Sequence, residues 1–225
     1  MNAQPNTKLV IVAKNTMLAE SLSNWLRHQP GLTVLGRAEA DADGLDFCRL
    51  NRPDMVLVDV SPPQFAGLDL VETLRQDLPA ARVVVISEHT DPYTIWRISR
   101  NKVHGFVEKS CLLTMLMEAI KSVAGGDNYY SPRYRNTEKE WLTRPEAFHK
   151  ILTKRERQIL LRVVAGRDDP AIGNELDIST HTVAVHRKNM RAKLRLHNDR
   201  ALIAYANTWG FGSATNPSSL RPAFV

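Results

Sequence analysis

The sequence predicts an α/β unit with a doubly wound, five-stranded parallel sheet, followed by a small all-α unit. In residues 1–126, short runs rich in Val, Leu and Ile alternate with segments of helical periodicity. These runs lack polar alternation, which is typical of parallel strands that helices cover on both faces. Beyond residue 149 the pattern changes, and only short helical segments follow to residue 209.

The strands and helices of the first unit follow in strict alternation. The apolar runs predict strands at Leu9–Ala13, Leu32–Gly36, Met55–Val60, Val83–Ser87 and Gly105–Val107. Helices are expected between and after them, at Met17–His28, Asp41–Asn51, Leu68–Asp77, Pro92–Asn101 and Leu112–Val123. A Gly-Gly-Asp-Asn run at 125–128 breaks the last helix, so we expect a linker with some packing of its own at 127–148. Residues 210–225, rich in Gly, Ser, Pro and Asn, are expected to form a disordered tail.

The positive charge belongs to the last third of the chain. The 225 residues carry 30 Lys and Arg against 24 Asp and Glu, a net charge of +6. Residues 150–225 hold 13 of the basic and 6 of the acidic residues, so the charge predicts a polyanionic partner there. Two cysteines form no disulfide framework, the polar N-terminus lacks a signal core, and no apolar run is long enough to span a membrane. We therefore expect a soluble cytoplasmic protein without a membrane partner.

Three polar side chains follow strands of the predicted sheet. Asp59 lies at the end of the third strand, Ser87 closes the fourth, and Lys109 follows the fifth. Because the carboxyl ends of parallel strands meet at one edge, these groups should share a crevice. Asp59 could act there as a nucleophile, with Ser87 and Lys109 binding phosphoryl oxygens. Spacing alone favours the alternative that Asp59 caps a strand and Lys109 is solvated.

Residues 8–125 resemble the receiver domain of bacterial two-component response regulators. The resemblance is strongest at Pro53-Asp54-Met55-Val56-Leu57-Val58-Asp59, followed by Pro63 and Gly67-Leu68. It implies a flavodoxin-like (CheY-like) fold in which Asp59 is the candidate phosphoacceptor and Lys109 the family's lysine. It also implies that Ser87 is the switch hydroxyl and Phe106 the switch aromatic. In the family, phosphorylation draws the hydroxyl inward, the aromatic side chain follows, and the surface used for dimer formation changes.

The first strand end departs from the family pattern. Ala13 and Lys14 stand where the family carries two adjacent acids that help to hold Mg²⁺, and Gln64-Phe65-Ala66 also differs from the usual loop. With Asp59 as the one remaining carboxylate, we expect no Mg²⁺ site, no other cofactor, and poor phosphorylation. Lys14 leaves two alternatives open. Its ammonium pairs with Asp59 in the place of the metal, or it points to solvent and the pocket is inert.

The second unit reads as a helix-turn-helix. Thr153 and Glu156 form a capping box at the start of its first helix, and Ser179 caps a helix from about Thr180 to Leu194. Val183, Met190 and Leu194 of that helix share the core-facing side. An exposed stripe of small and basic residues follows the same spacing, at Ala184, Lys188, Arg191 and Arg195. The alternative is a solvated charged face, but the stripe, the capped turn and the local charge favour DNA.

Residues 151–206 resemble the LuxR-type DNA-binding domain of NarL/FixJ regulators, within a domain that we place at 149–209. The matching residues are Leu152-Thr153, Arg155-Glu156, Gly166, Ile172, Leu176, Ile178-Ser179, Thr182-Val183, His186, Asn189-Met190, Lys193-Leu194 and Ala201. The resemblance implies that Val185 and Lys188 face base edges of double-stranded DNA. It places Thr182, His186, Arg187, Asn189, Arg191 and Lys193 at or near phosphates. Ala184 replaces a usual lysine and can touch a thymine methyl group, and the last helix, near 199–209, implies a homodimer.

The remaining motifs indicate no enzyme and no metal site. His181 and His186 lie too far apart around a helix to bind one ion, and no Cys/His ligand spacing, Gly-rich phosphate loop or nucleophile elbow is present. The sequence thus predicts a DNA-binding transcriptional regulator with a degenerate receiver, active largely without phosphorylation. Two alternatives stay open: a conventional regulator phosphorylated at Asp59 by a sensor kinase, and an adaptor that works through another regulator.

Overall fold

The computed structural model describes residues 6–39, 42–61 and 66–214, which form two compact units. Residues 6–39, 42–61, 66–90 and 95–136 make up the receiver-like unit. Residues 91–94 and 137–214 make up the helical unit.

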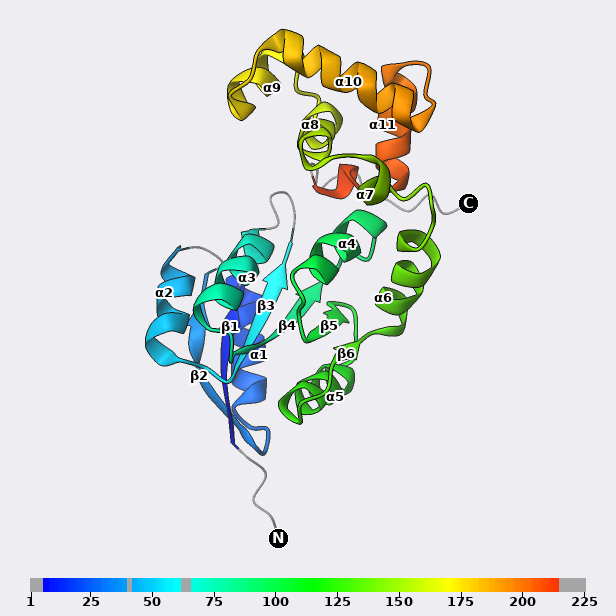
Figure 1. Cartoon of the computed structure of the whole chain (residues 1–225). Helices are drawn as coiled ribbons and strands as arrows, with labels where there is room; N and C mark the ends of the chain where they lie inside the picture. The colour runs from blue at the N-terminus through cyan, green and yellow to red at the C-terminus, as the bar shows by residue number, and fades with distance from the viewer. Residues whose placement is uncertain (1–5, 40–41, 62–65, 215–225) are drawn as a thin grey trace. The chain divides into compact units, whose positions relative to one another are not determined.

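The receiver-like unit is built on a parallel sheet with the strand order β2-β1-β3-β4-β5-β6 (Figure 1). The strands are β1 Thr7–Val12, β2 Leu32–Ala38, β3 Met55–Val60, β4 Arg82–Ser87, β5 Gly105–Glu108 and β6 Tyr129–Tyr130. All six residues of the central strand β3 are buried, as its continuous apolar run predicts. The structure confirms the predicted doubly wound fold class but adds β6 as a sixth strand.

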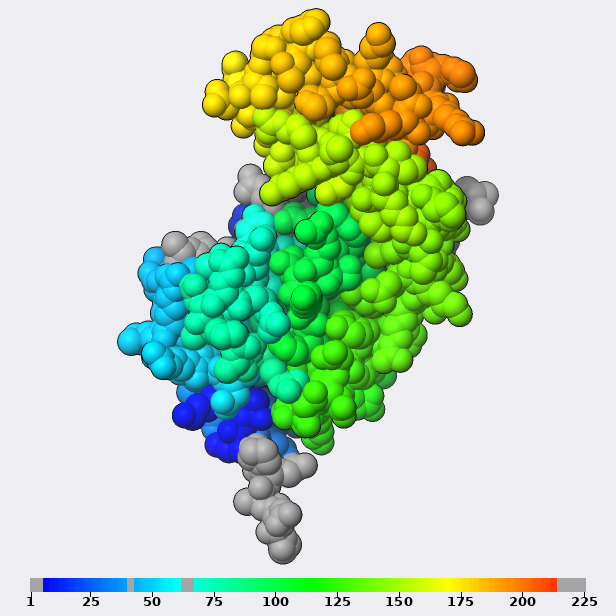
Figure 2. All heavy atoms as spheres, in the orientation of Figure 1, coloured from blue at the N-terminus to red at the C-terminus, as the bar shows by residue number. Residues whose placement is uncertain are grey.

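Helices cover both faces of this sheet (Figure 1). On one face lie α1 Thr16–Leu26 and α5 Leu113–Ala124, whose Leu22 and Ile120 join Ile11 in a buried cluster. On the other face lie α2 Ala42–Asn51, α3 Ala66–Asp77 and α4 Pro92–Arg100. In the space-filling view the side chains of α2 and α3 close over this second face (Figure 2). Both faces of the sheet are therefore shielded from water, and its chemistry lies at the strand ends.

The start of the predicted linker at 127–148 packs on the sheet, as the packing expected for this segment implies, and two of its residues form a strand. Tyr129 N–H donates to the His104 carbonyl at 3.0 Å, and β6 pairs with β5. The next helix, α6 Pro132–Thr137, buries Tyr134, which is 2% exposed. Tyr129, Tyr130 and Tyr134 offer apolar area to a strand edge that would otherwise be open, and this favours packing over a free linker. A π-helix, η1 Glu138–Leu142, and α7 Phe148–Ile151 then begin the helical unit.

The helical unit contains the predicted helix-turn-helix. Its helices are α8 Lys154–Val164, α9 Asp169–Leu176, α10 Thr180–Leu194 and α11 Asp199–Thr208, followed by the 3-10 turn η2 Gly212–Ala214. Ile159, Ile172, Val183 and Met190 form fully buried parts of its core. The periodicity of α10 therefore predicted its core-facing side correctly.

Residues 210–214 are folded, so the predicted tail at 210–225 begins too early. Phe211 is fully buried, its N–H donates to the Ala206 carbonyl at 3.0 Å, and its ring lies 5.0 Å from that of Phe148. The gain from burying an aromatic ring outweighs the turn-forming tendency of the glycines beside it. Residues 215–225 lie outside the described residues. Within the described ranges, no helix is both long enough and apolar enough to cross a bilayer.

Candidate functional sites: the receiver pocket and the α10 face

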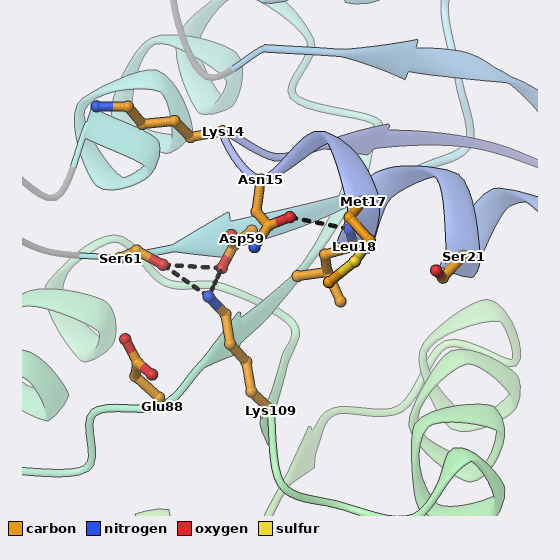
Figure 3. A pocket seen from close by; sticks show the side chains of 9 residues that line it. All are labelled: Lys14, Asn15, Met17, Leu18, Ser21, Asp59, Ser61, Glu88 and Lys109. Atoms are coloured by element: carbon orange, nitrogen blue, oxygen red, sulfur yellow. Dashed lines mark hydrogen bonds and ion pairs between the residues drawn. The ribbon is translucent and has the colours of Figure 1, made fainter.

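Asp59 pairs with Lys109 at the carboxyl edge of the sheet (Figure 3). The Asp59 side chain is only 3% exposed, and its Oδ1 lies 2.7 Å from Lys109 Nζ. Ser61 Oγ donates to the same oxygen at 3.2 Å and accepts from Lys109 Nζ at 2.7 Å. The buried carboxylate thus forms an ion pair with one ammonium group and accepts a hydrogen bond from one hydroxyl group.

Lys14 does not pair with Asp59, which contradicts the first of its two alternatives. Its side chain is exposed and extends away from Asp59 (Figure 3). The preceding residue, Ala13, is buried, and the next, Asn15, caps α1 by accepting from Leu18 N–H at 3.0 Å. The turn is therefore held by its backbone and by Asn15, and hydration favours the outward direction of a long lysine.

The residues around Asp59 enclose an open hollow of about 560 Å³. It is lined by Lys14, Asn15, Met17, Leu18, Ser21, Asp59, Ser61, Glu88 and Lys109. Glu88 is a second carboxylate there, with a half-exposed side chain. A dedicated Mg²⁺ site needs several oxygen ligands in octahedral geometry. Asp59 is engaged by Lys109, and two lysines line the hollow. Among the described residues, no cluster of three His, Cys, Asp or Glu that could hold a metal occurs.

The two predicted switch residues are both enclosed. Ser87 is fully buried, donates from Oγ to the Val60 carbonyl at 2.9 Å, and accepts from His89 N–H at 3.1 Å. Phe106 is also fully buried, with its ring centroid 5.2 Å from that of Tyr134. Tyr134 in turn stacks on Tyr130 at 4.8 Å. The sheet extension that the sequence assigned to a linker therefore covers Phe106.

Sequence reasoning missed Ser61 and Glu88. Ser61 lies two residues beyond Asp59, so the alternation of extended backbone places both side chains on one side. Glu88 directly follows β4 and lies at the same strand edge. The positions of both residues relative to the predicted strands could therefore have indicated their place in the site.

Side-chain caps begin both α8 and α10 of the helical unit. The capping box is confirmed, because Glu156 N–H donates to Thr153 Oγ1 at 3.2 Å and Thr153 N–H donates to Glu156 Oε2 at 2.8 Å. Ser179 Oγ accepts from Thr182 N–H at 3.0 Å at the start of α10. The turn before it needs a left-handed residue, Asp177 with φ of 53°, and brings the Ile178 carbonyl close to Gly173. A β-carbon at Gly173 would lie 2.7 Å from that oxygen, so the tight turn requires glycine there.

The predicted DNA-contacting residues divide into two groups. Ala184, Val185, Lys188 and Asn189 are exposed on α10, and Thr182 and His186 are half-buried. Three cations are instead held in ion pairs within the unit. Arg187 contacts Asp169 and, at 2.6 Å, Asp199, while Arg191 also contacts Asp199. Lys193 Nζ lies 2.8 Å from both carboxylate oxygens of the buried Glu156.

These ion pairs lower the pKa values of the carboxyl groups that form them. Burial alone would raise the pKa of Glu156, but hydrogen bonds from Lys193 and Thr153 outweigh it and the pKa is lowered. The pKa of Asp199 is lowered in the same way, because Arg191 and Arg187 outweigh its burial. Of the acids in these pairs, Glu156 had a signal in the sequence, its place in the capping box.

The chain matches two family models in succession. Residues 9–121 match the response regulator receiver domain, and residues 150–206 match the bacterial regulatory proteins of the luxR family. The transcriptional regulatory protein MctR of Rhizobium johnstonii is 32% identical over 213 residues, which cover 95% of this chain and 99% of MctR. The response regulator UvrY of Escherichia coli is 25% identical and covers 94% of this chain and 98% of its own.

Solved structures show the same fold. RcsB of Salmonella enterica serovar Typhimurium, bound to the promoter rprA, is 19% identical and has a TM-score of 0.62, covering 90% of this chain and 98% of its own. A two-component response regulator of the LuxR family from Aurantimonas sp. has a TM-score of 0.55 at 23% identity, covering 60% of this chain and 96% of its own. Since both domains match in order and a relative aligns over nearly the whole length, this protein belongs to the DNA-binding response regulators of the luxR family.

Proposed function

We propose that this regulator binds double-stranded DNA as a homodimer and that its receiver works without Mg²⁺-assisted phosphorylation. The observation that carries the proposal is the composition of the pocket around Asp59. Ala13 and Lys14 replace the acid pair, and Asp59 is held by Lys109 and Ser61.

The chemistry of phosphoryl transfer supports this proposal. A carboxylate attacks a phosphoryl group efficiently only when positive charge offsets the repulsion between the two anions. Lys109 supplies one such charge, but the side chains of Ala13 and Lys14 offer no oxygen ligand to a divalent ion. We therefore expect phosphorylation of Asp59 to be slow.

The enclosure of Phe106 supports a receiver in which this ring keeps a single orientation. An outward rotation of this ring would have to displace Tyr134, which is 2% exposed and stacked on Tyr130. Packed interiors resist such displacement, because each lost contact surface must be replaced. The signal that a conventional receiver passes through its aromatic residue is thus opposed by packing.

Intact-mass spectrometry after incubation with acetyl phosphate and Mg²⁺ tests the receiver part. We expect no phosphoryl adduct, and we expect Asp59→Asn to bind DNA with unchanged affinity. An adduct that is absent from Asp59→Asn and that tightens DNA binding would instead indicate a conventional regulator served by a sensor kinase.

Fluorescence anisotropy with labelled duplex DNA tests the DNA part. The pure protein should bind, and its affinity should fall steeply with salt, since Lys and Arg contacts to phosphate release counterions. Weak, salt-insensitive binding by the pure protein would contradict the proposal and favour an adaptor that works through another regulator.

A further inference from the structure

Arg187 and Arg191 lie on the flank of α10, beside its core-facing residues. They are one helical turn apart, and Arg187 is in turn four residues beyond the buried Val183. The side chains of Arg187 and Arg191 are 19% and 29% exposed. Val185, by comparison, is 41% exposed on the open side of the helix. The two guanidinium groups therefore face the neighbouring helices more than they face solvent.

The two arginines join three helices through two carboxylates. Arg187 contacts Asp169 at the start of α9 and Asp199 at the start of α11. Arg191 contacts the second oxygen of Asp199, so both oxygens of that carboxylate are occupied by α10. Guanidinium groups suit this role, because their donors lie in a rigid plane that can engage two acceptors at once.

The electrostatics agree with a fixed arrangement. Burial alone would lower the pKa of Arg187, but Asp169 and Asp199 raise it. The guanidinium of Arg187 is thus already balanced by two carboxylates before any DNA phosphate approaches.

We propose that Asp199, together with Asp169, sets the orientation of α10 on DNA through Arg187 and Arg191. The four are positioning residues, and the direct contacts belong to the exposed side of α10 that includes Val185 and Lys188. The proposal rests on α10 as the helix that contacts DNA. If that role fails, the unmodified protein will not bind DNA at all, which is distinguishable from every outcome below.

Two matched variants of the full chain test the proposal by the direction in which their affinity for DNA changes. Asp199→Asn and Glu175→Gln each remove one negative charge from a carboxylate that contacts two arginines, and the two side chains are 38% and 39% exposed. Glu175 pairs with Arg162 and Arg167, neither of which lies on α10. Charge alone predicts tighter binding to DNA for both variants, because each becomes more positive.

The probe is a labelled duplex selected from a random pool by the unmodified protein, with a scrambled duplex of the same composition beside it. We expect Asp199→Asn to weaken binding to the selected duplex about tenfold and to the scrambled duplex less. Glu175→Gln should bind within about twofold of the unmodified protein. Equal tightening in both variants would overturn the proposal.

Arg187→Lys and Arg187→Ala separate positioning from direct phosphate contact. A lysine can replace a phosphate contact but lacks the rigid planar fork that holds two carboxylates in one fixed geometry, so positioning predicts similar losses for both variants. The slope of log affinity against log salt should stay unchanged, whereas a lost phosphate contact would reduce it by about 0.9. A reduced slope in Arg187→Ala together with rescue by Arg187→Lys would overturn the proposal. Circular dichroism at the assay temperature ensures that only folded protein is compared, and a variant that does not fold is replaced by Asp169→Asn.

Discussion

Asp59 and Lys109 show what single residues can and cannot reveal before the fold is known. The order of strands predicted that Asp59, Ser87 and Lys109 would share one crevice. Asp59 and Lys109 pair there, whereas the buried Ser87 hydroxyl donates to the Val60 carbonyl and is not among the residues that line the hollow. Whether Lys14 pairs with Asp59 or points to solvent depends on side-chain direction. That direction follows from the turn at Asn15 and from the hydration of Lys14, and no pattern of residue types encodes either one.

Removal of Lys109 should destabilise the receiver-like unit. In Lys109→Met, Asp59 would keep only the Ser61 hydroxyl as a partner while its side chain is 3% exposed. An uncompensated buried carboxylate should lower the free energy of unfolding by roughly 1–3 kcal/mol. The double variant Asp59→Asn/Lys109→Met should recover most of this loss. Urea unfolding followed by circular dichroism measures both, and strictly additive losses in the double variant would contradict the pairing.

At the scale of elements, periodicity predicted long helices and buried strands well and short additions poorly. The strand at Met55–Val60 was predicted with its observed bounds, because a short run of apolar residues interrupted only by Asp59 is typical of a buried strand. β6 has two residues and α6 has six, which is too short for any periodic pattern. Their signal was the cluster of tyrosines, which indicated packing but not the partner.

The β6-α6 extension should stabilise β5 through Tyr134. Tyr134→Ala would remove a ring that is 2% exposed and contacts both Phe106 and Tyr130, so the free energy of unfolding should fall by about 3–5 kcal/mol. Hydrogen exchange of the β5 amides should accelerate accordingly. Tyr130→Phe is the control, since it removes only the hydroxyl that donates to the Val103 carbonyl at 2.7 Å and should cost about 1 kcal/mol. Equal protection of β5 in all three proteins would show that the extension is dispensable.

In α10, too, features within the helix were predictable, whereas contacts with other helices were not. Its own spacing predicted that Val183 and Met190 face the core. The acids that hold Arg187 and Arg191 come from α9 and α11, so the periodicity of α10 carries no information about them. The placement of both arginines near phosphates followed from the family resemblance and stays a prediction.

At the scale of the whole molecule, the division into an α/β unit and a basic helical unit was predictable, and its electrostatic detail was not. Residues 150–225 carry 13 basic residues against 6 acidic ones. Arg187, Arg191 and Lys193 form ion pairs with carboxylates of the same unit. The charge available to DNA on α10 is therefore smaller than composition suggests, and Lys188 becomes the exposed cation at its centre.

The two units should lose stability in different pH ranges. His104 in the receiver-like unit accepts a hydrogen bond from Val83 N–H at its Nδ1, at 3.0 Å, so its ring must be neutral there. Burial, with Arg75 and Arg82 nearby, lowers its pKa below the ordinary value of 6.5. As the pH falls below 6.5 the unfolded chain therefore binds a proton that the folded unit refuses, and the stability of this unit declines.

The helical unit should resist acid further, because its shifted groups are carboxylates. The lowered pKa values of Glu156 and Asp199 contribute stability above their ordinary values of 4.5 and 3.8, and this contribution is lost only as the pH falls below them. Hydrogen exchange in urea, corrected for the intrinsic rate at each pH, should show β4 and β5 weakening between about pH 7 and 5 while α8 and α10 stay protected. His104→Gln should abolish the weakening of the sheet, because the amide does not titrate. Parallel weakening of both units in this range, or an unchanged response in His104→Gln, would show that another group controls the acid sensitivity.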